Sequence, residues 1–284
     1  MIVVTGAGGT VGGAVAQELK ARGLSPRLAF HSLAKAERAK AAGDDAVVLD
    51  FDKPETLGPA LAGAEAVFLL GTGGSGQAQA EINLVDAARA AGVKRIVKLS
   101  VWEAAQENYA FARIHRTVER AIEASGVAWT FLRPTGFMQN FLTHLAPSIR
   151  ATGSIYQPAG DAKISHIDVR DIARVAAEAL TSEGHAGKAY GLSGPEALSY
   201  GEAAAVLSRV LDKQVGYVAV SDEAAGAGLV AAGVPAAYAE TVLDLYRHYR
   251  TGAVSGLSSV VKDITGREPT TFEQFVRDHQ SAFL

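Results

Sequence analysis

The sequence predicts an α/β fold: a doubly wound parallel sheet with strand order 3-2-1-4-5-6, followed by a smaller C-terminal lobe. Up to Pro134, short β-branched runs alternate with longer Ala-rich amphipathic stretches, the pattern of a parallel sheet covered by helices. The short runs are almost wholly apolar, as in strands that are buried on both faces. Beyond Pro134 the alternation becomes irregular. We therefore expect a first domain of residues 1–134 and a second of residues 135–284, with room for part of the second to return to the sheet.

The first domain is expected to contain six strands, most of them followed by a helix. The strands are Ile2–Thr5, Arg27–Phe30, Ala46–Asp50, Ala66–Leu70, Arg95–Ser100 and Trp129–Arg133. The clearest helices are Val11–Arg22, Leu33–Ala41, Gln77–Ala91 and Ile114–Ser125. A glycine lies just past the end of each, where the C′ position favours it: Gly23, Gly43, Gly92 and Gly126.

The second domain is expected to be mainly helical, with two short strands. The helices are Phe137–Ile149, Val169–Thr181, Tyr200–Leu211, Ser221–Ala232 and Ala236–Tyr249, and the strands are Lys163–Ile167 and Val215–Val220. Asp168 precedes the second of these helices, so we interpret Asp168-x-x-Asp171 as a helix start rather than a catalytic pair.

Composition excludes several classes of function. The 284 residues are 48% hydrophobic and carry a net charge of −3, with Lys and Arg scattered, so no nucleic-acid-binding face is expected. The absence of cysteine excludes disulfides and thiol chemistry. No apolar run approaches the roughly 18 residues of a membrane span, and no leader pattern is visible, so we expect a cytoplasmic protein. We find no metal-ligand spacing and no Gly-x-Ser-x-Gly motif.

A glycine-rich loop links the first strand to the first helix and carries the clearest functional signal. It contains Gly6, Gly8, Gly9, Thr10, Val11 and Gly12. Glycines at this turn let the backbone approach a pyrophosphate, which the helix N–H groups and dipole then bind. The spacing Gly6-x-x-Gly9-x-x-Gly12 differs from G-x-G-x-x-G, but its place between strand and helix favours a dinucleotide site over a simple tight turn.

The end of the second strand favours NADP(H) over NAD(H). An acidic residue there would accept from the ribose 2′-hydroxyl of NAD, but this chain has His31 and Ser32, with Lys35 on the next helix. These groups can donate to a 2′-phosphate. The alternative for Lys35 and the nearby Arg38 is an ordinary solvated helix surface.

Two further loops are expected at the same edge of the sheet. Asp50 and Phe51 close the third strand, where adenine could lie against the ring and bond the carboxylate. The flexible segment after the fourth strand includes Gly71, Thr72 and Gly73, and the carboxyl ends of the strands are where α/β proteins bind ligands. Ser100, at the end of the fifth strand, is the first polar candidate near a nicotinamide. The alternative for the glycine segment is a pliable connection.

A substrate pocket is expected from aromatic and methionine side chains around this edge. The candidates are Phe137, Met138 and Phe141 after the sixth strand, with Trp102 and Tyr109 opposite, and His166 as a further lining residue. The same residue types at helical spacing also form ordinary cores, and that alternative stays open.

Several motifs together resemble the NmrA-like branch of atypical short-chain dehydrogenases/reductases. These motifs are Thr5-Gly-x-x-Gly-x-x-Gly12, His115-x-x-x-Glu119, Ser125-Gly126-x-x-x-Thr130, Arg133-Pro134-x-x-Phe137-Met138-x-Asn140, His166-Ile-Asp168-Val-Arg-Asp171 and Thr265-Gly-Arg-x-Pro-Thr-Thr-Phe272. The resemblance covers nearly the whole chain. It implies a Rossmann fold that binds NAD(P), in a branch that includes quinone reductases, triphenylmethane-dye reductases and NADP-sensing regulators.

The usual Tyr-x-x-x-Lys pair of that superfamily is missing. Its Lys position falls on His115 and its Tyr position on Phe111, whose ring has no proton to donate. Tyr109-x-x-x-Arg113 has the spacing but is displaced by two residues, about 200° around the helix from the His115 face. Tyr109 is therefore kept as a secondary candidate for a chemical role. His115 is therefore expected to bond the nicotinamide ribose or the substrate, with an ordinary structural histidine as the alternative.

We conclude that the sequence predicts an NADP(H)-dependent oxidoreductase that passes hydride to a quinone-like or other conjugated acceptor. Such acceptors need positioning more than a proton carrier, whereas carbonyl reduction and sugar epimerisation need the missing tyrosine. The alternative is a non-catalytic NADP(H)-binding redox sensor. The expected partner is a small-molecule substrate, and the amphipathic helices are compatible with a homodimer.

Overall fold

The computed structural model describes residues 1–71, 73–74 and 76–284. The chain folds into two compact units. The first comprises residues 1–105, 112–133 and 169–191, and the second comprises residues 106–111, 134–168 and 192–284. The division is thus discontinuous in sequence, because a helix and a strand from beyond residue 134 belong to the first unit.

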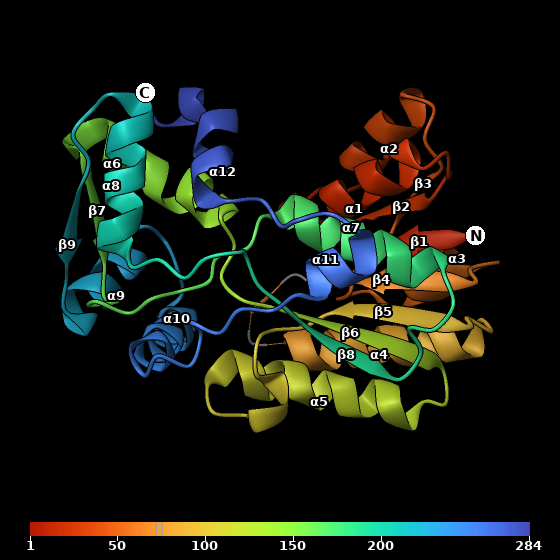
Figure 1. Cartoon of the computed structure of the whole chain (residues 1–284). Helices are drawn as coiled ribbons and strands as arrows, with labels where there is room; N and C mark the ends of the chain where they lie inside the picture. Colours follow the sequence, from red (N-terminus) through yellow and green to blue (C-terminus); the bar gives the residue numbers. More distant parts are fainter. Residues whose placement is uncertain (72, 75) are drawn as a thin grey trace. The chain divides into compact units, whose positions relative to one another are not determined.

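A seven-stranded sheet forms the centre of the first unit (Figure 1). The strands are β1 (Ile2–Val4), β2 (Arg27–Phe30), β3 (Ala46–Val48), β4 (Ala66–Leu69), β5 (Arg95–Leu99), β6 (Ala128–Pro134) and β8 (Lys188–Leu192). Their order is β3-β2-β1-β4-β5-β6-β8, and the pairs from β3 through β6 are parallel. The predicted order 3-2-1-4-5-6 is therefore confirmed, and β8 extends it at the β6 edge.

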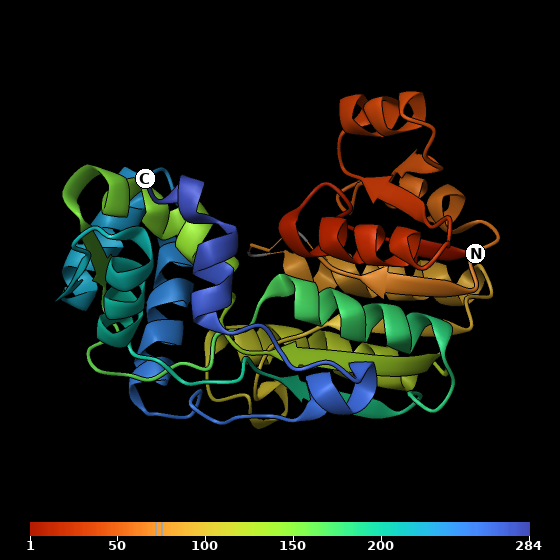
Figure 2. The same cartoon turned by 45° about the horizontal axis from the view of Figure 1, so that its top comes forward.

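Helices cover both faces of this sheet. They are α1 (Thr10–Ala21), α2 (Leu33–Ala41), α3 (Leu57–Leu61), α4 (Gln77–Ala90), α5 (Ala110–Ala124) and α7 (Val169–Thr181). Helices α1 and α7 lie side by side on one face, and α4 and α5 lie on the other (Figures 1 and 2). The glycines expected past α1, α2, α4 and α5 all have positive φ: +78° at Gly23, +92° at Gly43, +75° at Gly92 and +78° at Gly126.

The core of the first unit explains why its strands could be predicted from the sequence. Val67, Ile96 and Phe131 on β4, β5 and β6 are fully buried, and they pack with Leu84 of α4 and Val118 of α5. Because both faces of these strands are covered, nearly every residue in them is apolar.

The second unit is mainly helical. Its elements are the π-helical turn η3 (Phe141–Leu145), α6 (Ala146–Thr152), β7 (Ser154–Gln157), α8 (Tyr200–Leu211), β9 (Gly216–Ala219), α9 (Asp222–Ala231), α10 (Ala236–Arg250), α11 (Val260–Thr265) and α12 (Phe272–Asp278). Strands β7 and β9 form a separate parallel pair.

Two expectations for the second unit were wrong. Residues 163–167 form no strand, because only isolated bridges occur there, Ile164 to Leu198 and Phe137 to Ile167. The helix expected from Phe137 is interrupted by the π-helical turn η3 before α6 begins at Ala146. In the part of the chain that the structure describes, no helix is both long and apolar enough to cross a membrane.

Candidate functional site: a glycine loop and two buried polar clusters

The glycine-rich loop connects β1 to α1 as predicted. Thr5 fixes its start, because its hydroxyl oxygen lies 3.0 Å from both the Phe68 and the Leu70 carbonyl oxygens, which share its one proton, and it accepts from the Leu70 N–H at 2.8 Å. Gly6 then adopts a φ of +63°, a backbone conformation that glycine tolerates best. The loop is thereby tied to the carboxyl end of β4.

Close backbone packing makes glycine necessary at position 12. A Cβ atom there would lie 2.2 Å from the Gly6 carbonyl oxygen and 2.7 Å from the Thr5 carbonyl oxygen. Gly9 is the N-cap of α1 in an extended conformation, and it has no side chain to cover the N–H groups of the first turn. Thr10 and Val11 begin the helix behind it. The loop and helix therefore fit a pyrophosphate, which such a helix terminus binds through N–H groups and dipole.

The predicted 2′-phosphate donors lie beside this loop. Ser32 is the N-cap of α2, Lys35 is in its first turn, and both follow β2 directly. At Gly8, an added Cβ would lie 3.2 Å from Phe30 Cδ1 and 3.4 Å from Lys35 Cδ. The Lys35 chain thus passes along the glycine loop, and His31 is 66% exposed at the end of β2.

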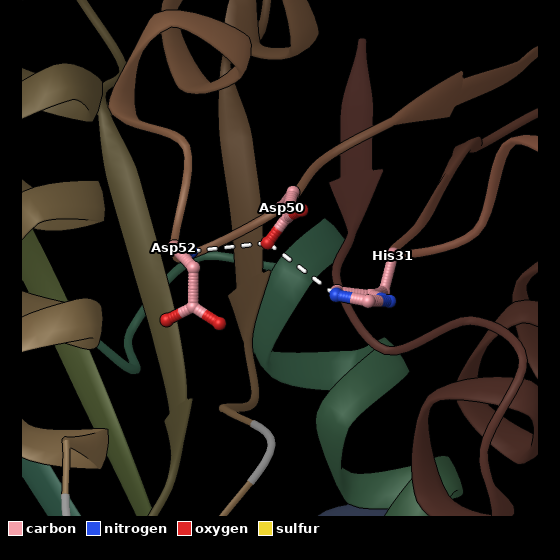
Figure 3. A group of neighbouring side chains, drawn as sticks. All are labelled: His31, Asp50 and Asp52. Atoms are coloured by element: carbon pink, nitrogen blue, oxygen red, sulfur yellow. Dashed lines mark hydrogen bonds and ion pairs between the residues drawn. The ribbon is translucent and has the colours of Figure 1, made fainter.

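His31 faces Asp50 across the ends of β2 and β3 (Figure 3). Its Nε2 lies 3.4 Å from Asp50 Oδ1, which also accepts from the Asp52 N–H at 3.1 Å, and Lys53 Nζ lies 3.3 Å from Oδ2. Burial raises the pKa of the Asp50 carboxyl, but the Asp52 N–H and the Lys53 and His31 charges outweigh it and hold that pKa below its usual value. Asp50 is therefore charged, and the Asp52 N–H and the neighbouring cationic side chains stabilise its negative charge.

In the described part of the chain, His31, Asp50 and Asp52 are the group of side chains close enough together to bind one metal ion. The ligand atoms of His31, Asp50 and Asp52 lie within 4.8 Å of one another. Both Asp50 oxygens already have N–H or cationic partners, so the arrangement is explained without a metal. One expectation here is corrected: Phe51 is 7% exposed and belongs to the hydrophobic core, so its ring does not offer a free face to adenine.

A buried ion pair lies behind the loop that follows β4. Lys98 of β5 and Glu81 of α4 are both fully buried, and Nζ lies 2.5 Å from Oε2. Gln77 donates to the other Glu81 oxygen at 2.9 Å. Gly71 passes so close that an added Cβ would lie 2.4 Å from that oxygen. Gly73 has a φ of +77°, and Thr72, also predicted to bind the cofactor, lies outside the described residues.

His115 of α5 completes this cluster. Its Nδ1 lies 3.1 Å from Lys98 Nζ, and its side chain is 7% exposed. Burial and the Lys98 charge both lower the pKa of His115 well below its usual value. The structure therefore brings the predicted His115 together with two residues that the sequence analysis had missed.

A second polar cluster contains Ser100. Its hydroxyl donates to Glu119 Oε1 at 2.7 Å, and Arg133 of β6 donates to both Glu119 oxygens, at 2.9 and 2.7 Å. Burial raises the pKa of Glu119, but the bonds from Arg133 and Ser100 outweigh this effect and lower it. Since its proton is engaged, Ser100 has only lone pairs to offer a ligand, and it positions Glu119.

Trp102 packs within the first unit. A Cβ added at Gly191 of β8 would lie 2.9 Å from Trp102 Cζ3. The indole therefore covers the last strand, and Trp102 is half-buried.

The other predicted pocket residues belong to the second unit, where several are core. Phe141 is fully buried between the rings of His166, Tyr200 and Phe272, with centroid separations of 4.6–5.7 Å, and Met138 is 1% exposed. The expectation for Phe141 is corrected, because its ring is enclosed on several sides by other rings, whereas the buried Met138 lines a small cavity. Phe137 is half-buried.

His166 and Tyr109 are also buried in the second unit. His166 lines a small cavity with Met138, and burial lowers its pKa to about 4. Tyr109 is 2% exposed and stacks on His248 with ring centroids 4.3 Å apart. The phenol predicted as a chemical candidate is therefore enclosed by its own unit.

One signal could have revealed the missed pair in advance. Lys98 is charged inside the apolar run Ile96-Val97-Lys98-Leu99, which was expected to be buried on both faces. A buried ammonium needs a partner of opposite charge, so a carboxylate on a covering helix could have been sought.

Comparison with known proteins agrees with this geometry. Residues 1–276 match the model of the NmrA-like family. The chain is 37% identical to an NAD(P)H azoreductase from Xenophilus azovorans, over 100% of this chain and 99% of that protein. Among solved structures, an NADPH-dependent quinone oxidoreductase from Escherichia coli complexed with NADPH gives a TM-score of 0.89 at 29% identity, covering 99% and 100% of the two chains. A Citrobacter triphenylmethane reductase complexed with NADP(H) gives 0.86 at 29% identity, covering 98% and 99%.

Proposed function

The chain belongs to the NmrA-like family, and on this premise we propose that it is an NAD(P)H-dependent reductase of quinone-like or other conjugated acceptors. The observation that carries the proposal is the glycine loop at the start of α1, where a Cβ atom at Gly12 would have no room. The chain also aligns from end to end with azo, quinone and dye reductases. The loop would hold the pyrophosphate of the cofactor, with Gly6, Gly8 and Gly9 lining it.

We propose that NADPH is preferred over NADH. At the end of β2 the chain has His31 and Ser32 where an NAD site commonly has a carboxylate, and Lys35 lies along the loop. Asp50 lies behind His31, but its charge is compensated by Lys53 as well. A 2′-phosphate would therefore meet hydrogen-bond donors, among them the Lys35 ammonium, rather than a free carboxylate.

The chemistry requires alignment more than proton transfer. The reduced nicotinamide supplies a hydride, and a quinone that gains this hydride takes one proton from water to become a hydroquinone. Phe111 stands where the superfamily's proton-donating tyrosine would be, which suits an acceptor that does not need one. His115 would bond the nicotinamide ribose and hold the ring in place.

Absorbance at 340 nm tests the proposal directly. Protein is mixed with NADPH, or with NADH in parallel, and with a panel of benzoquinones, naphthoquinones, azo dyes and triphenylmethane dyes. We expect protein-dependent oxidation that is faster with NADPH. Tight calorimetric binding of NADPH without oxidation across the panel would contradict the reductase and favour the redox-sensor alternative.

A further inference from the structure

The environment of Lys98 determines which nitrogen of His115 carries a proton. The Lys98 ammonium has three partners: Glu81 Oε2 at 2.5 Å, the Leu99 carbonyl oxygen at 2.7 Å and His115 Nδ1 at 3.1 Å. An ammonium has three protons to donate and no lone pair to accept with. Glu81 supplies the counter-charge of an ion pair, and the Leu99 carbonyl and His115 Nδ1 are hydrogen-bond partners. Because the ammonium can only donate, Nδ1 of His115 has to be the acceptor.

A neutral imidazole carries one N–H, so accepting at Nδ1 leaves the proton on Nε2. Burial and the nearby Lys98 charge keep the pKa of His115 well below its usual value, and the ring stays neutral at pH 7. Within the described part of the chain, Nδ1 has this contact while Nε2 has no hydrogen-bond partner, and the residue as a whole is 7% exposed.

We propose that Lys98 is a positioning residue that fixes the Nε2–H tautomer of His115, and that this N–H is a permanent neutral donor to an oxygen of the bound ligand. The ligand oxygen is a hydroxyl or carbonyl, because either accepts a bond from a neutral N–H. That it belongs to the nicotinamide ribose or the acceptor rests on the proposed function; the tautomer itself does not.

The surroundings of Lys98 hold the ammonium in place. Glu81 supplies its counter-charge from α4 and is itself oriented by Gln77. Gly71, two residues after the end of β4, leaves the space that the Glu81 carboxylate occupies. The cluster joins Glu81 and Gln77 of α4, Lys98 of β5 and His115 of α5, and α4 and α5 cover the same face of the sheet as Figure 1 shows. Gly71, predicted as a cofactor contact, therefore also has a steric role in this cluster.

Histidine-selective nitrogen NMR on the cofactor-free protein tests the tautomer. The chain has seven histidines, so a His115→Gln variant identifies the His115 signals. We expect the wild-type spectrum to show Nε2 protonated and Nδ1 unprotonated, unchanged between about pH 8 and pH 6, where an ordinary histidine titrates. A protonated Nδ1, or titration in that range, overturns the proposal without any further variant.

A variant that removes both charges tests the role of Lys98. In Lys98→Met combined with Glu81→Gln, no uncompensated charge is left buried, and circular dichroism verifies folding. We expect its His115 Nδ1 signal to shift toward the averaged position of exchanging tautomers and to become pH-dependent, whereas Lys94→Met, at an exposed lysine just before β5, leaves the spectrum unchanged. An unaltered spectrum in the folded double variant overturns the proposal. Because no cofactor is present, these results are independent of whether NADPH is oxidised.

Discussion

Arg133 and Glu119 form a two-pronged ion pair: Nε donates to Oε1 at 2.9 Å and Nη2 donates to Oε2 at 2.7 Å. The Ser100 hydroxyl donates to the same carboxylate, so β5, β6 and α5 meet at one fully buried side chain. Glu119 is four residues after His115, which places both on one face of α5. The pair therefore sets the rotation of the helix that presents His115 to Lys98.

Breaking this pair is predicted to destabilise the protein. Arg133→Met leaves the Glu119 charge buried with weaker compensation, and the free energy of unfolding should fall by about 3 kcal/mol at pH 7. Glu119→Gln added to that variant should recover part of the loss. Urea unfolding measures both. As a control, Arg209→Met removes an exposed ion pair with Glu273 and should change the free energy by less than about 1 kcal/mol. A loss from Arg133→Met as small as that of the control would show that the pair contributes little.

Stability should depend on pH through His166. Burial lowers its folded pKa from 6.5 to about 4, so between these values the unfolded chain binds more protons than the folded one. His166 therefore does not lower the free energy of unfolding above pH 6.5. As the pH drops toward 4, protonation of this residue in the unfolded chain lowers that free energy by about 3 kcal/mol. Urea unfolding at a series of pH values should show a smaller slope for His166→Gln than for the wild type. Parallel curves would contradict the assignment. His115 contributes with the same sign, so the slope should shrink rather than vanish.

His31→Asp is predicted to weaken NADPH binding far more than NADH binding. The substitution removes a donor and adds a second negative charge beside Asp50, where a 2′-phosphate would lie. A charge-assisted bond contributes about 1.5–3 kcal/mol, so the Kd for NADPH should rise at least about tenfold while the Kd for NADH changes little. Calorimetric titration measures both. Lys40→Met, in the last turn of α2, provides a matched control. Equal losses for the two cofactors would remove the basis for a 2′-phosphate site.

Gly12→Ala should abolish cofactor binding. The new methyl group would lie 2.2 Å from the Gly6 carbonyl oxygen, a separation that no rotamer can relieve, so the loop has to move. We expect an NADPH Kd at least about a hundredfold higher, equivalent to about 3 kcal/mol. Gly58→Ala in α3 is the matched control, since a Cβ there meets no atom within 4 Å. Unchanged binding by Gly12→Ala would place the pyrophosphate elsewhere.

The sequence predicted the sheet well because the strands of a doubly covered parallel sheet show their burial in their composition. Val67 and Ile96 belong to such runs, whereas β8 contains Lys188 and exposed positions and gave no comparable signal. Side-chain roles were harder to predict. Phe141 has the residue type of a pocket wall and of a core, and only its packing against Phe272 decides between them.

The partners of the buried polar residues could not be predicted from the sequence either. Lys98 was visible as a charge in an apolar strand, but its pairing with Glu81 joins segments 17 residues apart through helix placement that local spacing does not specify. Glu119 was noticed only as part of a motif, and its partners Ser100 and Arg133 come from two different strands. Tertiary geometry is what turns these residues into clusters.

Tyr109→Phe decides whether the displaced tyrosine takes part in the chemistry. A general acid contributes about 10²–10⁴-fold to the rate, so its loss would reduce kcat by at least that factor. Tyr109 is 2% exposed and stacked on His248, and the phenylalanine ring preserves that stacking. We therefore expect kcat for quinone reduction to stay within about threefold of wild type, with a stability loss of about 1 kcal/mol from the hydroxyl. Steady-state kinetics with NADPH and a benzoquinone measure the rate, and urea unfolding measures the stability. A hundredfold drop in kcat at unchanged stability would mean that the buried phenol reaches the acceptor, and that proton transfer as well as alignment limits the reaction.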